Sequence, residues 1–305
     1  MINSAYFKKG ILSVVVMLFS FSTVLAQDQE GETKEKKPLA RAPFESGYFM
    51  DNMTVKTQPS KTLEFILQHR FGTIQNAFED LFGIWGATNI RMGLNYSITD
   101  NLTIGFGTAK NNMYQDLSLR YTFFHQREGG FPLTIGYYGD IALNATNKSN
   151  FGKDYTFIDR LSYYHELMVA RRFCRMFSMQ VSCAFTHYNK VDSTKKNDAL
   201  SFSAIARLKV SPQTSVVVSY EQPFYLGYDT PFILKYGQKG MYYNSSTSKL
   251  NLNLGVEIST STHTFHVFLG ASQGILPQDI VLYNKNNFFN GEIIIGFNMT
   301  RLWNF

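Results

Sequence analysis

The sequence predicts an all-β fold, a transmembrane antiparallel up-and-down β-barrel of twelve strands with both termini in the periplasm. Three observations predict it. The last segment of the chain alternates apolar and polar residues, the connections between strand segments alternate between short and long, and the N-terminus carries a secretion signal.

The final segment, residues 290–305, shows the alternation most clearly. Its apolar face carries Ile293, Ile295, Phe297, Met299, Trp303 and Phe305, and its polar face carries Glu292, Gly296, Asn298, Thr300 and Asn304. A barrel strand in a membrane needs both faces, because one faces lipid and the other a wet lumen. A terminal Phe with an aromatic residue two positions before it resembles the sorting signal of outer-membrane barrels. We therefore expect Trp303 and Phe305 to form an assembly signal and the barrel-assembly machinery to be a partner.

The N-terminus has the three regions of a secretory signal peptide. Lys8 and Lys9 precede an apolar run at 11–19, and small or tolerated residues lead to a cleavage point after Ala26. An uncleaved anchor is the weaker interpretation, because the run is short for a span of about 20 residues. The position after Ala26 is not Cys, which argues against a lipoprotein anchor. We expect residues 1–26 to be removed on export.

Residues 27–57 are expected to form a periplasmic leader, and residues 58–305 the barrel. The part at 27–42 is dominated by charge and is expected to be flexible. The part at 44–57 is less polar. Two interpretations stay open for it: packing at the lower mouth of the barrel, or the ordered end of the leader.

Twelve segments read as strands, each with period-2 alternation or turn residues at its ends. They cover residues 61–70, 89–98, 102–108, 116–124, 131–144, 160–173, 177–188, 199–210, 215–222, 250–259, 263–272 and 288–305. Connections after the even-numbered segments are short, and those after the odd-numbered ones are longer, which is the pattern of periplasmic turns and extracellular loops. A soluble sandwich or lipocalin-like barrel would also bury one apolar face. The signal peptide, the terminal Phe and the loop asymmetry favour the membrane barrel.

A group of short stretches resembles a family of outer-membrane β-barrel proteins of unknown function from Bacteroidota. The stretches are Phe44-Glu45-Ser46, His69-Arg70-Phe71-Gly72, Leu81-Phe82-Gly83, residues 91–96 and residues 98–105. The resemblance is clearest over 44–107 and extends more loosely over the rest of the barrel. It implies an outer-membrane location and no known activity, cofactor or site residue.

Composition excludes several function classes. The formal net charge is +6, of which Lys8 and Lys9 contribute two, and this is too mild to indicate nucleic acid as a partner. Cys174 and Cys183 fall on a turn and the strand after it, too far apart for a disulfide. The sequence contains no phosphate loop, nucleophile elbow, CxxC or HExxH. We expect no metal and no cofactor.

Charged residues of the inward row are the candidates for solute selectivity: Glu64, Arg91, Arg120, Asp140, Glu166, Arg207, Glu221, Glu257 and Glu292. Asp116, Arg172 and Lys209 share that row, which gives seven acids and five bases. Mixed signs at similar heights favour interstrand ion pairs in a narrow water-filled barrel over a selectivity ring of one sign.

Two long loops and one histidine are further candidates. Ile74, Phe78, Leu81 and Phe82 have helical spacing in loop 71–88, which suggests a short amphipathic helix in an ordered loop, a lid or a segment on the leaflet surface. Loop 223–249 is rich in aromatic residues and Gly, which suits either sugar or peptide stacking or loop packing. His165 falls on the apolar row, near Cys183, without the Ser and amide that a membrane phospholipase would need.

The function predicted from these features is that of a cell outer-membrane barrel forming a narrow channel for small solutes, in contact with outer-membrane lipid. One alternative is a non-conducting structural barrel, or one that docks a periplasmic partner through residues 27–57. A less favoured alternative is an outer-membrane lipid-modifying enzyme.

Overall fold

The computed structural model describes residues 37–192, 195–226 and 248–305. The expected signal peptide, the first part of the expected leader up to residue 36, and most of the aromatic loop 223–249 lie outside these residues. Among the described residues, no helix is long and apolar enough to cross a membrane.

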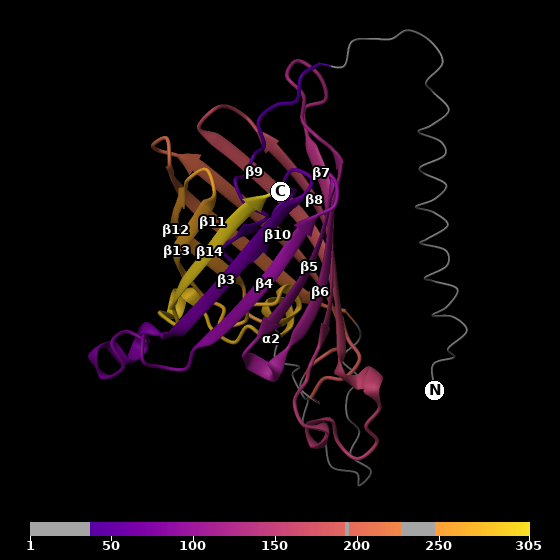
Figure 1. Ribbon diagram of the computed structural model, residues 1–305. Helices are drawn as coiled ribbons and strands as arrows, with labels where there is room; N and C mark the ends of the chain where they lie inside the picture. The colour runs from indigo at the N-terminus through magenta and orange to yellow at the C-terminus, as the bar shows by residue number, and fades with distance from the viewer. Residues whose placement is uncertain (1–36, 193–194, 227–247) are drawn as a thin grey trace. The chain divides into compact units, whose positions relative to one another are not determined.

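Twelve antiparallel strands close into a barrel in which each strand pairs with the next in the chain and β14 pairs with β3 (Figure 1). Their bounds are β3 Thr62–Thr73, β4 Asn89–Ser97, β5 Leu102–Ala109, β6 Gln115–Phe124, β7 Thr134–Leu143, β8 Leu161–Arg172, β9 Phe177–Tyr188, β10 Asp198–Lys209, β11 Thr214–Tyr225, β12 Asn251–Ser259, β13 His263–Gly270 and β14 Ile294–Asn304. The predicted twelve-stranded up-and-down barrel is confirmed. We call the end with the short connections and the C-terminus the turn end, and the other the loop end.

The alternation of side chains explains why the barrel closes. Along β9, for example, buried Gln180, Ala184 and Thr186 alternate with the outward Val181 and Phe185. Closure satisfies the hydrogen bonds of every strand edge, which a sheet surrounded by lipid requires.

The final strand is shorter than predicted. Residues Phe288–Asn290 form the 3-10 helix η5, and Gly291 follows with φ +76°, a left-handed conformation that ends the turn before β14 begins. Ile294, which departs from the apolar row, faces the interior and is fully buried. Arg301 faces outward and lies over the ring of Trp303 at 4.8 Å.

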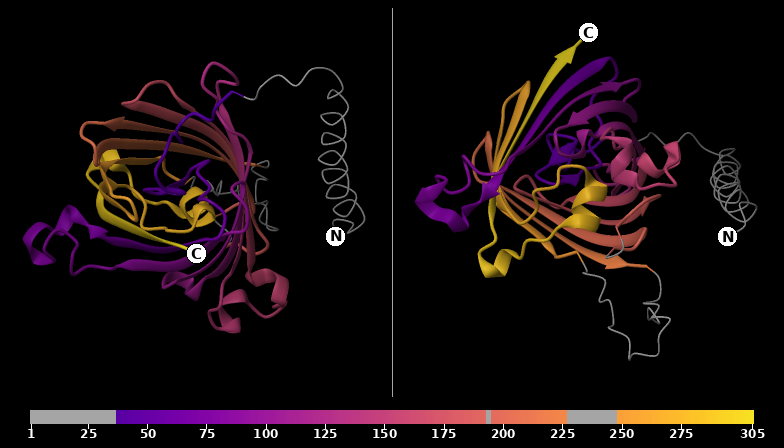
Figure 2. Two further views of the ribbon diagram at one scale, coloured as in Figure 1. Left: turned by 45° about the horizontal axis from the view of Figure 1, so that its top comes forward. Right: turned by 90° about the horizontal axis from the view of Figure 1, so that it is seen from below.

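Residues 44–58, here called the plug, fill the barrel interior from the turn end. They contain a two-strand hairpin, β1 (Tyr48–Phe49) and β2 (Asn52–Met53), and Figure 2 shows this indigo segment inside the ring of strands. Phe44, Phe49 and Met50 are at most 1% exposed. The compact unit that contains the barrel begins at Leu39, so residues 39–57 of the expected leader belong to that unit. Residues 44–58 lie inside the barrel because their apolar side chains are buried there, whereas the polar side chains of a flexible leader would stay in water.

The connection between β13 and β14 also enters the barrel, from the loop end. It carries the helix α2 (Pro277–Tyr283), which begins with Pro in its first turn and has six buried residues among seven (Figure 2). Pro277, Gln278, Asp279, Ile280, Val281 and Leu282 are the buried ones. The interior is therefore occupied from both ends.

The loop after β3 does not cover the barrel. It begins with the 3-10 helix η1 (Ile74–Glu79), which is broken at Ala77, and it projects sideways from the barrel wall (Figures 1 and 2). The alternative of a lid is wrong, and the expected regular amphipathic helix is absent from this described loop. Shorter 3-10 helices lie in two other long loops: η2 (Asn111–Met113), η3 (Lys148–Phe151) and η4 (Phe157–Arg160).

Candidate functional site

The structure places most of the candidate selectivity residues together in the barrel interior. Eight of them are at most 5% exposed: Glu64, Arg91, Arg120, Asp140, Glu166, Arg207, Glu221 and Glu257. Glu292 lies elsewhere, before β14, where its Oε2 accepts a hydrogen bond from the backbone N–H of Asn287. Asp116 joins the buried set, whereas Arg172 and Lys209 are only half-buried at the turn end.

Three of the four buried arginines form ion pairs with carboxylates. Arg91 Nε lies 2.9 Å from Asp116 Oδ1. Arg207 Nε lies 2.6 Å from Glu257 Oε1. Arg70, which was not among the predicted candidates, is paired with Asp51 of the plug. Its position in the same row as Glu64 was the signal that could have identified it.

Arg120 is stabilised in a different way, without a carboxylate partner among the described ion pairs. Its guanidinium lies 5.3 Å from the ring centroids of both Tyr48 and Tyr138, and its Nη2 donates to the carbonyl oxygen of Gly47 at 2.8 Å. Cation–π contacts strengthen when they are removed from water. The plug therefore supplies part of the environment of this wall residue.

Several buried carboxylates have neutral hydrogen-bond donors in place of arginine. Glu221 accepts from Ser201 Oγ at 2.8 Å, and Asp140 accepts from Gln278 Nε2 at 2.7 Å. Among the described residues, the strands and plug bury seven acids and four arginines: Asp51, Glu64, Asp116, Asp140, Glu166, Glu221, Glu257, and Arg70, Arg91, Arg120, Arg207. Acids therefore exceed arginines by three, against an excess of two acids over bases in the predicted row. Asp51 and Arg70 join the buried set, while Glu292, Arg172 and Lys209 lie outside it.

The barrel wall binds the plug largely through the main chain of the plug. Gln180 accepts from the N–H of Val55 at 3.0 Å and donates to the carbonyl of Met53 at 2.8 Å. Thr122 Oγ1 donates to the carbonyl of Val55 at 2.8 Å, and Asn298 Nδ2 donates to that of Met50 at 2.6 Å. Polar groups of the wall thus satisfy plug backbone that would otherwise be buried without partners.

A cavity of about 670 Å³ opens at the loop end, on the outer side of α2. Its lining combines amides, aromatic rings and charges of both signs, including Asn111, Asn144, Arg160, Tyr283 and Asn286. Asp279 of α2 is also in the lining, where its Oδ1 accepts from Tyr114 at 3.3 Å and Tyr188 at 3.1 Å. Burial raises the pKa of Asp279 to about 6. This cavity, here called the vestibule, is suited to a small polar solute.

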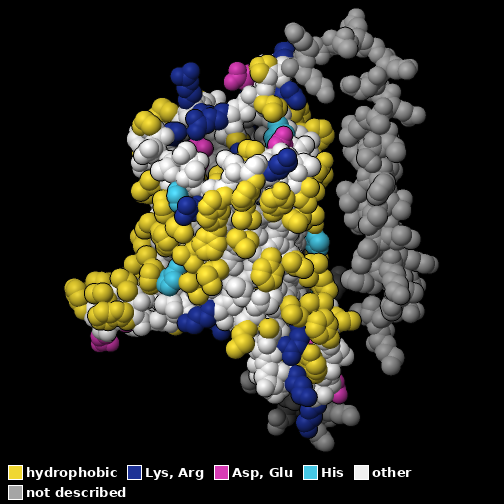
Figure 3. All heavy atoms as spheres, in the orientation of Figure 1, with side chains coloured by type: hydrophobic (Ala, Val, Ile, Leu, Met, Phe, Trp, Pro, Cys, Tyr) yellow, Lys and Arg dark blue, Asp and Glu magenta, His cyan; other side chains and the backbone are white. Residues whose placement is uncertain are grey.

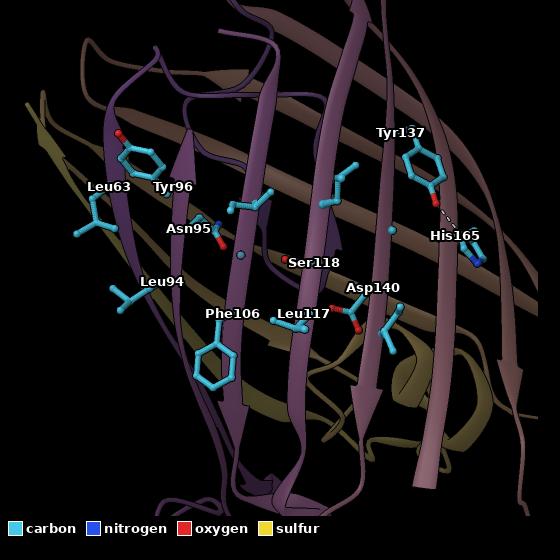
Figure 4. Close-up of a pocket in the computed structure, with 15 residues that line it drawn as sticks. Leu63, Leu94, Asn95, Tyr96, Phe106, Leu117, Ser118, Tyr137, Asp140 and His165 are labelled. Carbon is cyan, nitrogen blue, oxygen red and sulfur yellow. Dashed lines mark hydrogen bonds between the residues drawn. The ribbon is translucent and has the colours of Figure 1, made fainter. Parts of the chain in front are cut away.

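The outer wall carries a separate apolar groove of about 600 Å³, lined by side chains such as Leu94, Phe106 and Ile141 (Figure 4). Tyr137 and His165 are also in its lining, and Tyr137 Oη and His165 Nδ1 share a hydrogen bond of 2.6 Å. His165 lies opposite Phe185 of β9 and Gly139 of β7, so it does not lie across from Cys183, which lies opposite Leu167. Cys174 and Cys183 are both free and exposed. No three His, Cys, Asp or Glu side chains within the described ranges are arranged to hold a metal.

Comparison with known proteins identifies a family. A family model described as "Membrane bound beta barrel domain (DUF5777)" matches residues 44–303, so the match begins at the first residue of the plug. No curated protein matches the chain.

Three solved structures with a similar fold are distant in sequence. A NanC porin has 6% identity and a TM-score of 0.45, covering 79% of this chain and 98% of that one. The KdgM porin has 7% identity and a TM-score of 0.44, covering 80% and 99%. The COG4313 outer membrane channel from Pseudomonas putida F1 has 11% identity and a TM-score of 0.48, covering 84% and 100%. These identities are too low to transfer a substrate.

Proposed function

We propose a function from one premise: the chain belongs to the family of membrane-bound β-barrel domains (DUF5777) whose model matches residues 44–303. It is an outer-membrane β-barrel, since a closed barrel with an apolar outer wall is the architecture that spans that membrane. On this premise we infer a gated channel for small polar solutes, held closed by the plug and by α2. Origin in the Bacteroidota and the periplasmic position of both termini stay predictions.

The observation that carries the proposal is the way the plug is attached. Its covalent link to the barrel is at the start of β3, and its polar contacts with the wall are side-chain hydrogen bonds and ion pairs. Its departure would break none of the pairings between barrel strands. When the plug leaves, Gln180, Thr122 and Asn298 of the wall can replace their hydrogen bonds to the plug backbone by hydrogen bonds to water. A wall of apolar side chains could not be hydrated in this way.

Opening needs a trigger, because the plug also buries Tyr48, Phe49 and Met53. Two sources of free energy are consistent with the geometry. A solute in the vestibule could displace α2, and a periplasmic partner could pull on the chain before the plug. The chain leaves the interior beside the β6–β7 turn, where Ala40 N–H donates to the carbonyl of Gln126 at 2.9 Å.

The charge of the interior supports a preference among solutes. Without the plug, the strands present six of the buried acids against four arginines, and Glu166 and Glu221 have no arginine partner among the described ion pairs. We propose that the open channel favours small cations and neutral polar solutes over anions.

A reversible disulfide tests whether the plug is the gate. A Cβ built on Gly136 of β7 lies 3.6 Å from Cβ of Val55, which is within disulfide range. We would introduce Val55→Cys and Gly136→Cys after replacing Cys174 and Cys183 by Ser, and record single-channel currents. We expect silence when the pair is oxidised and conductance steps after reduction. Val55→Cys alone is the matched control and should not respond to oxidant.

The competing candidate is a non-conducting barrel that docks a periplasmic partner. The observation that favours it is the occupation of the interior from both ends. If the introduced thiol of the single variant Val55→Cys becomes reactive to a thiol reagent, showing that the plug leaves, while no current is seen, the channel proposal fails and the docking barrel stands. A lipid-modifying enzyme is the least supported function. The lipid-facing His165 is hydrogen-bonded to Tyr137, and in the described structure no serine is hydrogen-bonded to it.

A further inference from the structure

The loop that projects sideways after β3 exposes a concentrated group of apolar side chains. We call residues 72–86 the knob. Phe78 is 82% exposed and Trp85 75%, and Leu81, Phe82 and Ile84 are each about two-fifths exposed. In Figure 3 the knob is the yellow cluster that stands out from the barrel wall, at the level where the yellow lipid-facing belt ends. The plug, α2 and the vestibule do not use it.

The knob is a built structure with a closed neck. Gly72 N–H donates to the carbonyl of Gly83 at 2.8 Å, and Gly83 N–H donates to Asp80 Oδ1 at 2.8 Å. Gly83 has φ +83°, and a Cβ there would lie 2.3 Å from the carbonyl oxygen of Gly72. Only glycine permits this approach of the two ends of the loop.

The backbone of the knob holds residues in unfavourable conformations. Ala77, Leu81 and Phe82 have φ of 47°, 52° and 56°, which is rare for side chains of this size. The rings of Phe78 and Phe82 pack edge to face, with centroids 5.0 Å apart. Strained residues persist where the surrounding structure fixes them, and they cluster at functional sites. Here the strained turn directs its apolar side chains outward.

The knob is continuous with the lipid-facing wall. The outward row of β3 passes through Leu67, His69 and Phe71 into the knob, and the rings of His69 and Phe71 lie 4.2 Å apart. Because β3 spans the membrane, the knob leaves it at the membrane boundary of the loop end and extends along that boundary. Trp and other aromatic side chains prefer this interfacial depth.

We propose that the knob inserts Phe78, Phe82 and Trp85 into the lipid leaflet at the loop end and anchors that side of the barrel. Lipid is the occupant that the structure favours, because the apolar surface continues a wall already covered by lipid and extends over the bilayer next to it. A second copy of the chain is the competing occupant.

Tryptophan fluorescence tests this, because the sequence has only two tryptophans, Trp85 and Trp303. In a Trp303→Phe variant of the mature chain, Trp85 is the only reporter. We would refold it in phosphatidylcholine vesicles whose acyl chains carry bromine either near the headgroup or near the chain end. We expect blue-shifted emission that the shallow bromines quench most, severalfold more strongly than aqueous acrylamide does.

Two variants keep the test independent of folding. Gly83→Ala should open the neck and reduce bromine quenching of Trp85, while heat-modifiable migration on gels shows that the barrel still folds. Phe78→Trp, with Trp85 and Trp303 both replaced by Phe, places the reporter on a second side chain of the knob. Emission as in water with strong acrylamide quenching overturns the proposal. So does bromine quenching that falls as the protein-to-lipid ratio rises, since this would mean that a second copy covers the knob.

Discussion

Arg70 of β3 and Asp51 of the plug form an ion pair that solvent does not reach. Arg70 Nη2 lies 2.7 Å and Nε 3.0 Å from Asp51 Oδ1, and both side chains are 0% exposed. Asn251 of β12 donates to the other carboxylate oxygen at 2.9 Å, and the guanidinium lies 4.8 Å from the ring centroid of Phe268. This pair ties the plug to two separate parts of the wall, so it should report on the closed state.

Asp51→Ala should loosen the plug. The change leaves the buried Arg70 without a counter-charge, which costs about 3–5 kcal/mol when a buried pair is broken on one side. We expect more frequent channel opening, and faster cleavage by protease within the plug. Both are measurable on refolded protein in bilayers and vesicles.

Arg41→Ala is the matched control, because it removes an ion pair with Glu45 whose arginine side chain is 61% exposed. Exposed pairs contribute about 0–1 kcal/mol, so opening should hardly change. Equal effects of both variants would show that the buried pair is not what holds the plug.

The strands could be predicted from the sequence because lipid and lumen impose opposite demands on neighbouring residues. Val181, Val216 and Val267 face outward while Gln180, Ser215 and His266 face inward, so period-2 alternation survives around the whole barrel. Turn residues such as Asp100 and Asn101 then fixed the strand ends. The same alternation predicted that the side chains of Glu166 and Glu221 point into the barrel.

The interior inserts could not be predicted in the same way. Phe49 and Met50 of the plug and Ile280 and Val281 of α2 are too few to show a period, and an apolar stretch beside a barrel fits several locations. The location of these segments depends on the space inside the barrel and on the hydrogen-bond partners that the wall provides. Gln180 is such a partner for the plug, and Asp140 for Gln278 of α2. Alternation also does not give height along the barrel, which is why Arg172 and Lys209 were counted with the interior although both are half-buried at the turn end.

Docking of α2 should depend on pH through Asp279. Its pKa in the docked state is about 6, above the usual value near 3.9, so the docked helix binds the proton more tightly than the released one. The contribution to docking is fully present below about pH 4 and is lost as pH rises through about 6, a change on the order of 3 kcal/mol. We expect α2 to exchange its amide hydrogens more readily near neutral pH than in acid.

Asp279→Asn is the comparison for that measurement, because the amide oxygen can still accept from Tyr114 and Tyr188 but does not titrate. The ratio of exchange rates between wild type and variant removes the intrinsic effect of pH on exchange. A ratio that stays constant between about pH 4 and about pH 7 would contradict a role for this carboxyl.

Glu221→Gln should weaken any cation preference of the open channel. The change keeps the acceptor for Ser201 Oγ, now at 2.8 Å, and removes one charge from the acidic excess. In the background of Asp51→Ala, we expect the reversal potential in a salt gradient to move toward zero. Glu292→Gln is the control, because Glu292 lies outside the barrel interior, and a shift of the same size there would argue for a general charge effect.

Phe305→Ala tests the assembly signal at the end of β14. Phe305 is 80% exposed, and its described hydrogen bond is a backbone one, from its N–H to the carbonyl of Lys61 at 3.2 Å. Removing this side chain should therefore change the stability of the folded barrel by no more than about 0.5 kcal/mol. We nevertheless expect a severalfold fall in the amount of heat-modifiable, membrane-inserted protein in cells, with normal refolding of the purified chain in detergent.

Phe289→Ala is the control, because it removes an aromatic side chain of similar exposure, 73%, away from the terminus and should leave the cellular level unchanged. Because the two variants lose similar side chains and differ in position, a fall confined to Phe305→Ala would assign the effect to recognition during assembly. Normal levels of both would show that the terminal Phe is not needed as an assembly signal.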